Sequence, residues 1–266
     1  MSSSAPAAPL TAARPGHRDA GALRRLTITE LKLFARERVG PLWGVGFPVL
    51  LLIIFGAIPG FRTPVSKATP HISILDAYVP ILIAFVLAML AINVLPAVLA
   101  GYREKGVLRR MATTPVGPRR VLAAQLIICV GTAAVTLVVL LAVARIAYHV
   151  ALPGQLAGFL AAALLTTLAL VSIGLFYAAV APTGKAANAM GAITFFPMMF
   201  FAGLWLPIAA MPALLRHISH FTPLGAGVQA LTDAWQGHWP HPMNLVTLAI
   251  YAVVLGAGAA RLFRWE

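Results

Sequence analysis

The sequence predicts an all-α integral membrane protein with six transmembrane helices, an N-terminal amphipathic helix at the membrane interface and a re-entrant helical hairpin between spans five and six. Three observations support this fold class. Apolar residues make up 60% of the 266 positions and charged residues only 10%, whereas a soluble domain has roughly half and a quarter. Six apolar runs each approach the roughly 20 residues that cross a bilayer as a helix. The basic residues divide unequally between the two sides that these runs define.

The six predicted spans contain no Lys, Arg, Asp or Glu. With the amino terminus in the cytosol, 16 of the 20 Lys and Arg residues lie on the cytoplasmic side. The positive-inside rule therefore predicts a multi-pass protein of the cell (plasma or inner) membrane with both termini in the cytosol. The spans cover residues 41–59, 78–100, 121–144, 155–180, 188–207 and 243–260.

The segment before the first span has two parts. Residues 1–19 are rich in Ala, Pro and Ser, which predicts a disordered cytosolic tail. Residues 20–38 place Leu and Phe on one side of a helix and Arg and Lys on the other, which predicts a helix lying in the membrane interface. From residue 20 to residue 266 we expect a single transmembrane domain.

Residues 101–120, between the second and third spans, form a basic cytoplasmic segment. It carries six Lys and Arg residues against the single acid Glu104. This composition predicts a short, charged, helical surface that a soluble partner can engage. A stop-transfer run without a partner is the alternative, but it would require neither Glu104 nor an apolar helix face.

Residues 208–242, between the fifth and sixth spans, mix five flanking or internal prolines with apolar helical pieces on the outer side. Such pieces need cover, so we predict a re-entrant connector that dips into the outer leaflet. It also holds two HxxH pairs, His217 with His220 and His238 with His241. The nearby Trp235 and Trp239 favour an ordinary interfacial composition over a metal site, and we expect no metal.

Several function classes lack support in the sequence. There is no Walker-type phosphate loop, no HExxH motif and no pair of carboxylates within a span, so we expect neither catalysis nor nucleotide binding by this chain. The absence of ionisable residues within the spans disfavours an ion-coupled secondary carrier. The net charge is +13, and the basic residues that produce it cluster beside the apolar spans. Anionic lipid headgroups are therefore their expected partner, and nucleic acid is not.

Candidate residues for a substrate path lie in three spans. The fifth span is rich in Phe and Met, a soft apolar surface suited to a hydrophobic substrate. Asn93 and Gln125 are polar groups within apolar runs, where an interhelical hydrogen bond is the alternative to a role in lining a cavity. The path candidates are Asn93, Gln125, Phe196, Met199, Phe200 and Trp205.

Two segments carry a family resemblance. Residues 103–110, REKGVLRR, with Thr114-Pro115-Val116, are similar to the REKGTLRRL…TPV signature that follows the second span in permeases of type-2 ABC exporters. Residues 197–207, PMMFFAGLWLP, with the Met-Pro, Pro-Leu and Ala-Leu pairs that follow, resemble the same family's PxxFLSGxFxP…LP…NPL…AL region. The chain departs from the usual pattern at Tyr102, Val107, Ala202 and Thr232.

The resemblance implies a function and partners. In that family the segment after span two is a coupling helix that seats on a separate soluble ABC ATPase subunit, and two permease copies enclose the path. The resemblance implies that the ATPase subunit binds ATP. It also implies that the permease pairs either with an identical chain or with a second, different permease. The residues placed on the coupling surface are Arg103, Glu104, Lys105, Leu108, Arg109 and Arg110.

The substrate class stays open at the level of sequence. Without a soluble domain to handle sugars or peptides, a hydrophobic drug, an antibiotic or a lipid-like molecule is the first expectation, and export is implied by the resemblance alone. A polysaccharide or glycolipid precursor is the second. A secondary carrier and a membrane-embedded enzyme or assembly factor are the remaining classes.

Overall fold

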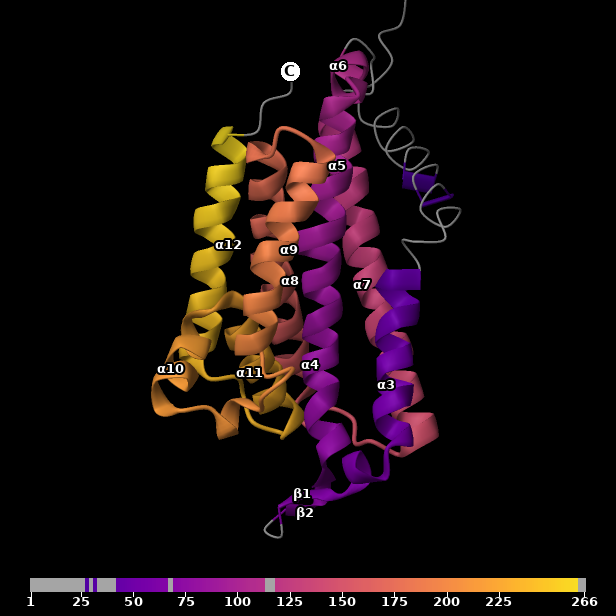
Figure 1. Cartoon of the computed structure of the whole chain (residues 1–266), viewed down its shortest axis with the longest axis vertical. Helices are drawn as coiled ribbons and strands as arrows, with labels where there is room; N and C mark the ends of the chain where they lie inside the picture. The colour runs from indigo at the N-terminus through magenta and orange to yellow at the C-terminus, as the bar shows by residue number, and fades with distance from the viewer. Residues whose placement is uncertain (1–26, 29–30, 33–41, 67–68, 113–117, 263–266) are drawn as a thin grey trace, which may run out of the picture.

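The chain folds as a bundle of helices in the computed structural model, which describes residues 27–28, 31–32, 42–66, 69–112 and 118–262 (Figure 1). The predicted tail at residues 1–19 lies outside the described residues. So does most of the predicted interfacial helix at residues 20–38, of which residues 27–28 and 31–32 are helical.

The long helices run alongside one another in the bundle (Figure 1). A π-helical turn, η1, leads into α3, and α4, η3 and α5 then form one continuous rod that ends at the short helix α6. The next long helices are α7, α8 and α9, and the shorter α10 and α11 precede the last helix, α12. The bounds are η1 Leu42–Gly46, α3 Phe47–Ala57, η2 Pro59–Arg62, β1 Pro64–Ser66, β2 Thr69–Ser73, α4 Ile74–Ala88, η3 Met89–Val94, α5 Leu95–Glu104, α6 Val107–Ala112, α7 Pro118–Tyr148, α8 Leu156–Val180, α9 Gly184–Phe201, η4 Ile208–Ala210, α10 Ala213–Phe221, α11 Pro223–Trp235 and α12 Pro242–Leu262.

Among the described residues, four helices are long and apolar enough to cross a membrane. They are Ile74–Glu104, Arg120–Tyr148, Leu156–Val180 and Pro242–Leu262, which correspond to predicted spans two, three, four and six. The first predicted span appears as a shorter apolar helix, Gly44–Ala57. The fifth appears as α9, which has 18 residues, begins four residues before the predicted start and ends six before the predicted end.

The described part of the chain is helical as predicted, with one small addition that the sequence did not predict. Strands β1 and β2 form a small antiparallel hairpin after α3, at the end of the bundle opposite α6 (Figure 1). Ser73 then caps α4: its hydroxyl accepts from the N–H of Asp76, whose carboxylate accepts from the N–H of Ser73 at 2.8 Å. This reciprocal pair satisfies donors at the start of the helix, so strand and helix meet at a defined angle.

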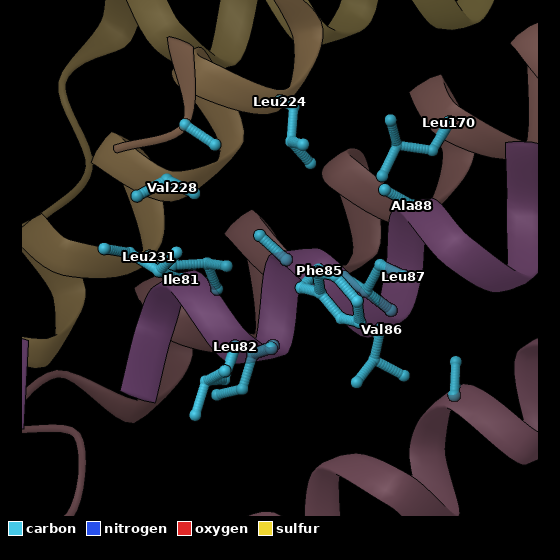
Figure 2. Packing of buried hydrophobic residues seen from close by; sticks show 14 of the residues in the cluster. Ile81, Leu82, Phe85, Val86, Leu87, Ala88, Leu170, Leu224, Val228 and Leu231 are labelled. Carbon is cyan, nitrogen blue, oxygen red and sulfur yellow. The ribbon is translucent and has the colours of Figure 1, made fainter. Parts of the chain in front are cut away.

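The helix α4 lies at the centre of the core. Twelve of its fifteen residues are buried, and a helix that is apolar all round is typical of a position with neighbours on every side. Figure 2 shows Ile81 and Phe85 of α4 beside Leu224, Val228 and Leu231 of α11, with Leu170 of α8 near Ala88. By contrast α7 and α12 expose apolar side chains such as Val138 and Val253, the arrangement expected where lipid replaces water.

The middle of the central rod is a π-helical turn, η3, and Pro96 follows it as the second residue of α5. Proline has no N–H to donate to the carbonyl of residue 92, and the irregular turn accommodates this loss within a continuous helix. Two glycines press against the turn. A side chain at Gly174 of α8 would collide with the carbonyl oxygen of Ala91, and one at Gly191 of α9 would lie 2.5 Å from that of Ile92.

The helix α11 is inserted among α4, α8, α9 and α12. Ten of its thirteen residues are buried. Its first turns reach the middle of α8, where Gly227 packs against Thr166. Its last residue, Trp235, packs edge-to-face on Phe159, near the start of α8. The second helix of the predicted connector, α11, therefore packs along the first half of α8.

Candidate functional site

The basic segment that was predicted to engage a partner forms a sharp corner between α5 and α6 at the α6 end of the bundle (Figure 1). Gly106 has φ +65°, a left-handed conformation that glycine adopts without a steric penalty. Its N–H donates to the carbonyl of Arg103 at 2.9 Å, which closes α5, and α6 starts directly afterwards. The structure thus has a two-helix corner in the segment for which the sequence predicted a charged, helical surface.

Arg103 and Glu104 attach this corner to the turn between α8 and α9. The Arg103 guanidinium donates to the carbonyl of Ala179 at 3.0 Å and also to that of Ala181. The Glu104 carboxylate accepts from the N–H of Gly184 at 3.0 Å, at the first residue of α9. A cation beside the end of one helix and an anion beside the start of the next both complement the helix dipoles.

The other predicted coupling residues divide by burial. Leu108 is 1% exposed and anchors α6 in the bundle. Lys105, Arg109 and Arg110 are exposed, and Arg110 donates to the carbonyl of Lys105 at 3.2 Å. The corner therefore combines an inward-facing anchor with a surface that carries three basic residues.

Four of the six predicted path residues line one cavity, which we name the Trp205 cavity. It has a volume of about 550 Å³ and lies between α3, the α4–η3 rod and α9. Asn93, Phe196, Met199 and Trp205 all line it, and Asn188 adds a second amide to a wall that is otherwise apolar and aromatic. The volume suits a drug-sized ligand. The further lining residues are Phe47, Leu51, Phe55, Phe85, Met89, Ala192, Phe195 and Leu204.

The two remaining path candidates lie elsewhere. Gln125 is buried in α7, where it lines a separate void of about 30 Å³ together with Cys129 and Thr132. Phe200 packs edge-to-face on Phe201, with ring centroids 5.4 Å apart. Neither side chain is among the residues that line the Trp205 cavity.

Sequence reasoning missed a second cavity, which we name the Asp233 cavity. It has a volume of about 670 Å³ and lies between η2, α4, η4 and α11. Gln229, Thr232 and Asp233 supply its polar wall. Their spacing at i, i+3 and i+4 on an apolar helix was the available signal, since it places all three on one face. The other lining residues are Ile58, Gly60, Phe61, Ile74, Ala77, Tyr78, Ile81, Ala202, Pro207, Ile208 and Val228.

Three aromatic rings separate the two cavities. Phe55 lines the Trp205 cavity, whereas Phe61 and Tyr78 line the Asp233 cavity. Phe55 stacks on Phe61 with centroids 4.9 Å apart, and Tyr78 packs edge-on against Phe55 at 5.5 Å and Phe61 at 5.2 Å. The Tyr78 hydroxyl donates a long hydrogen bond, 3.5 Å, to the carbonyl of Leu204. One face of the central rod thus passes from one cavity to the other across this aromatic cluster.

The histidines of the connector make local contacts. His220 lies 3.3 Å from the side-chain oxygen of Asn244, joining α10 to α12. The His241 N–H donates to Asp233 at 3.0 Å, and its ring accepts from the N–H of Met243. Within the described ranges no three His, Cys, Asp or Glu residues form a group that could hold a metal ion.

A family profile described as ABC-2 type transporter matches residues 21–234. The chain belongs to the ABC-2 type transporter family. The match extends from the segment before α3 to the end of α11, so it includes the α5–α6 corner and both cavities of this ABC-2 permease. Among curated proteins, none matches the chain. Membership makes the chain a membrane permease of an ABC transporter, a subunit type that is generally non-catalytic and associates with an ABC ATPase.

Proposed function

We propose that this ABC-2 permease is the membrane subunit of an ATP-driven exporter in the cell membrane, in which a separate soluble ATPase engages the α5–α6 corner. The observation that carries the proposal is the attachment of the corner. Arg103 and Glu104 bind the α8–α9 turn, while Lys105, Arg109 and Arg110 remain on the surface. A displacement of the corner is thereby passed to α8 and α9 as well as to the rod that carries it.

The topology that fits this function has six crossings with both termini in the cytosol. In it, α3 and α9 complete the set of spans, with the hairpin of α10 and α11 re-entering from the outer side. Support comes from the directions of the helices in Figure 1 and from the depth that α11 reaches beside Thr166. Breaks in backbone hydrogen bonding at that depth are tolerated when protein surrounds them, as it does around α11.

We further propose that substrate passes along the face of the rod that carries Asn93, Met89, Phe85 and Tyr78. This face borders the Trp205 cavity and then the Asp233 cavity. The apolar and aromatic walls favour a hydrophobic drug, an antibiotic or a lipid-like molecule over a polysaccharide, whose hydroxyls would need many polar partners. In this scheme the subunit works as a pair of identical chains or with a second permease, and ATP is held by the partner.

The decisive experiment measures coupling in a complex with a co-expressed ABC ATPase. The double variant Arg109→Ala, Arg110→Ala should lower both co-purification of the ATPase and substrate-stimulated ATP hydrolysis, because charge-assisted contacts fix register on a partner. Arg216→Ala, an exposed change in α10, is the matched control. Full complex formation and full hydrolysis in the double variant would overturn the proposal.

A further inference from the structure

The Asp233 cavity has one feature that its apolar walls do not explain. Of the residues that line it, Asp233 alone carries a formal charge at neutral pH. No Lys or Arg side chain lines the cavity, and within the described part of the chain no cation forms an ion pair with this carboxylate. The carboxylate is half-buried, so its charge is available to a cationic ligand that enters the cavity.

The contacts of Asp233 leave its carboxylate incompletely satisfied. One oxygen accepts from the backbone N–H of His241 at 3.0 Å, and the other makes no hydrogen bond to the described residues. An ionised carboxylate has about four acceptor positions, so most of them remain open. The side chain is half-buried beside Thr232 and one turn from Gln229, both on the cavity wall.

Two aromatic residues of the lining are also suited to a cationic ligand. Phe61 and Tyr78 line the cavity, and aromatic rings attract cations through the negative potential of their faces. Ile58, Ile81 and Val228 provide apolar surface around them. From the single carboxylate, the two aromatic rings and a volume of about 670 Å³, we infer that this cavity binds a lipophilic organic cation. The inference rests on the proposed function and names its substrate class.

The competing interpretation is structural. Asp233 accepts the His241 N–H and so fastens the end of α11 to the start of α12. Asn at this position keeps a side-chain oxygen for that N–H and removes only the charge. Asp233→Asn therefore separates the two interpretations, and its thermal stability reports whether the turn is intact.

The test uses the full-length chain in lipid nanodiscs and equilibrium binding of radiolabelled tetraphenylphosphonium, with empty nanodiscs subtracted. Triphenylphosphine oxide, a neutral compound of similar shape, serves as the competing ligand. Asp233→Asn should bind the cation about tenfold more weakly, since a charge-assisted contact is lost, and should keep its affinity for the neutral compound. Asp233→Glu should retain cation binding. Thr232→Val removes a polar group of the same wall but leaves the charge, so it should weaken cation binding less than Asp233→Asn does.

Equal affinity of the wild type and Asp233→Asn for tetraphenylphosphonium, at unchanged thermal stability, would overturn the inference. So would a wild-type chain that prefers the neutral compound. Because the binding assay contains no ATPase, such results leave the coupling proposal intact. Conversely, the chain could bind the cation through Asp233 and form no complex with an ABC ATPase. That result would refute the proposed function and would still support the cation site.

Discussion

The carboxylate of Glu104 accepts the backbone N–H of Gly184 at 3.0 Å, one residue after Arg103 binds the carbonyl oxygens at the end of α8. Two adjacent side chains of opposite charge therefore hold both ends of one turn. This arrangement joins the α8–α9 turn to the α5–α6 corner, although the two lie about 80 residues apart in the sequence.

Arg103→Ala should destabilise the chain and uncouple it. The change leaves the carbonyls of Ala179 and Ala181 without this donor, which costs about 1.5–3 kcal/mol for bonds to a charged group. We expect a lower unfolding temperature in nanodiscs and less transport per ATP hydrolysed in the complex. Arg216→Ala, an exposed change in α10 away from the corner, is the control. Identical coupling ratios for the two variants would argue against a role for the α8–α9 turn.

Gly191→Ala should impair folding, because the added methyl group would lie 2.5 Å from the carbonyl oxygen of Ile92. Overpacking of this kind costs about 1–3 kcal/mol, and α9 would be pushed from the π-helical turn. Gly131→Ala is the matched control, since a side chain there meets nothing within 4 Å. Helix propensity predicts that the control is neutral or more stable by up to about 1 kcal/mol. Thermal unfolding followed by size-exclusion chromatography measures both.

Phe196→Ala should weaken substrate handling, whereas Ile193→Ala should not. Both side chains lie on α9 and are exposed in the single chain, but only Phe196 lines the Trp205 cavity. Removing the ring from a ligand contact should raise the apparent KM about tenfold. Transport assays on inverted vesicles provide the comparison. If both variants lose transport equally, the exposed face of α9 acts through packing and not through the cavity.

The sidedness of the bundle has a direct test. In a Cys129→Ala background, which removes the single native thiol, we expect Thr63→Cys to react with an impermeant maleimide added to intact cells. Arg109→Cys should react only after the membrane is permeabilised. Both positions are exposed, so access to reagent does not depend on burial. Labelling of Arg109→Cys from outside would invert the proposed topology.

Long apolar runs made α7, α8 and α12 predictable from sequence, and their bounds lie within a few residues of the expected ones. Hydropathy reports whether a segment avoids water but not what it packs against. For that reason the sequence predicted a coupling surface at Arg103 and Glu104 without revealing that these side chains bind the α8–α9 turn. The Asp233 cavity was missed for a related reason: its walls come from four separate elements. The β1–β2 hairpin was missed because its strands have only three and five residues.

The position of α11 has an evolutionary consequence. The helix that carries Asp233 belongs to a hairpin at the end of the bundle opposite α6, and it meets the rod through side chains such as Leu224 and Leu231 (Figures 1 and 2). Substitutions at Gln229, Thr232 and Asp233 alter the cavity wall without touching Arg109 or Arg110. In the two proposals above, cargo selectivity and ATPase engagement depend on different segments of the chain, so relatives that differ in substrate are expected to keep the same ATPase.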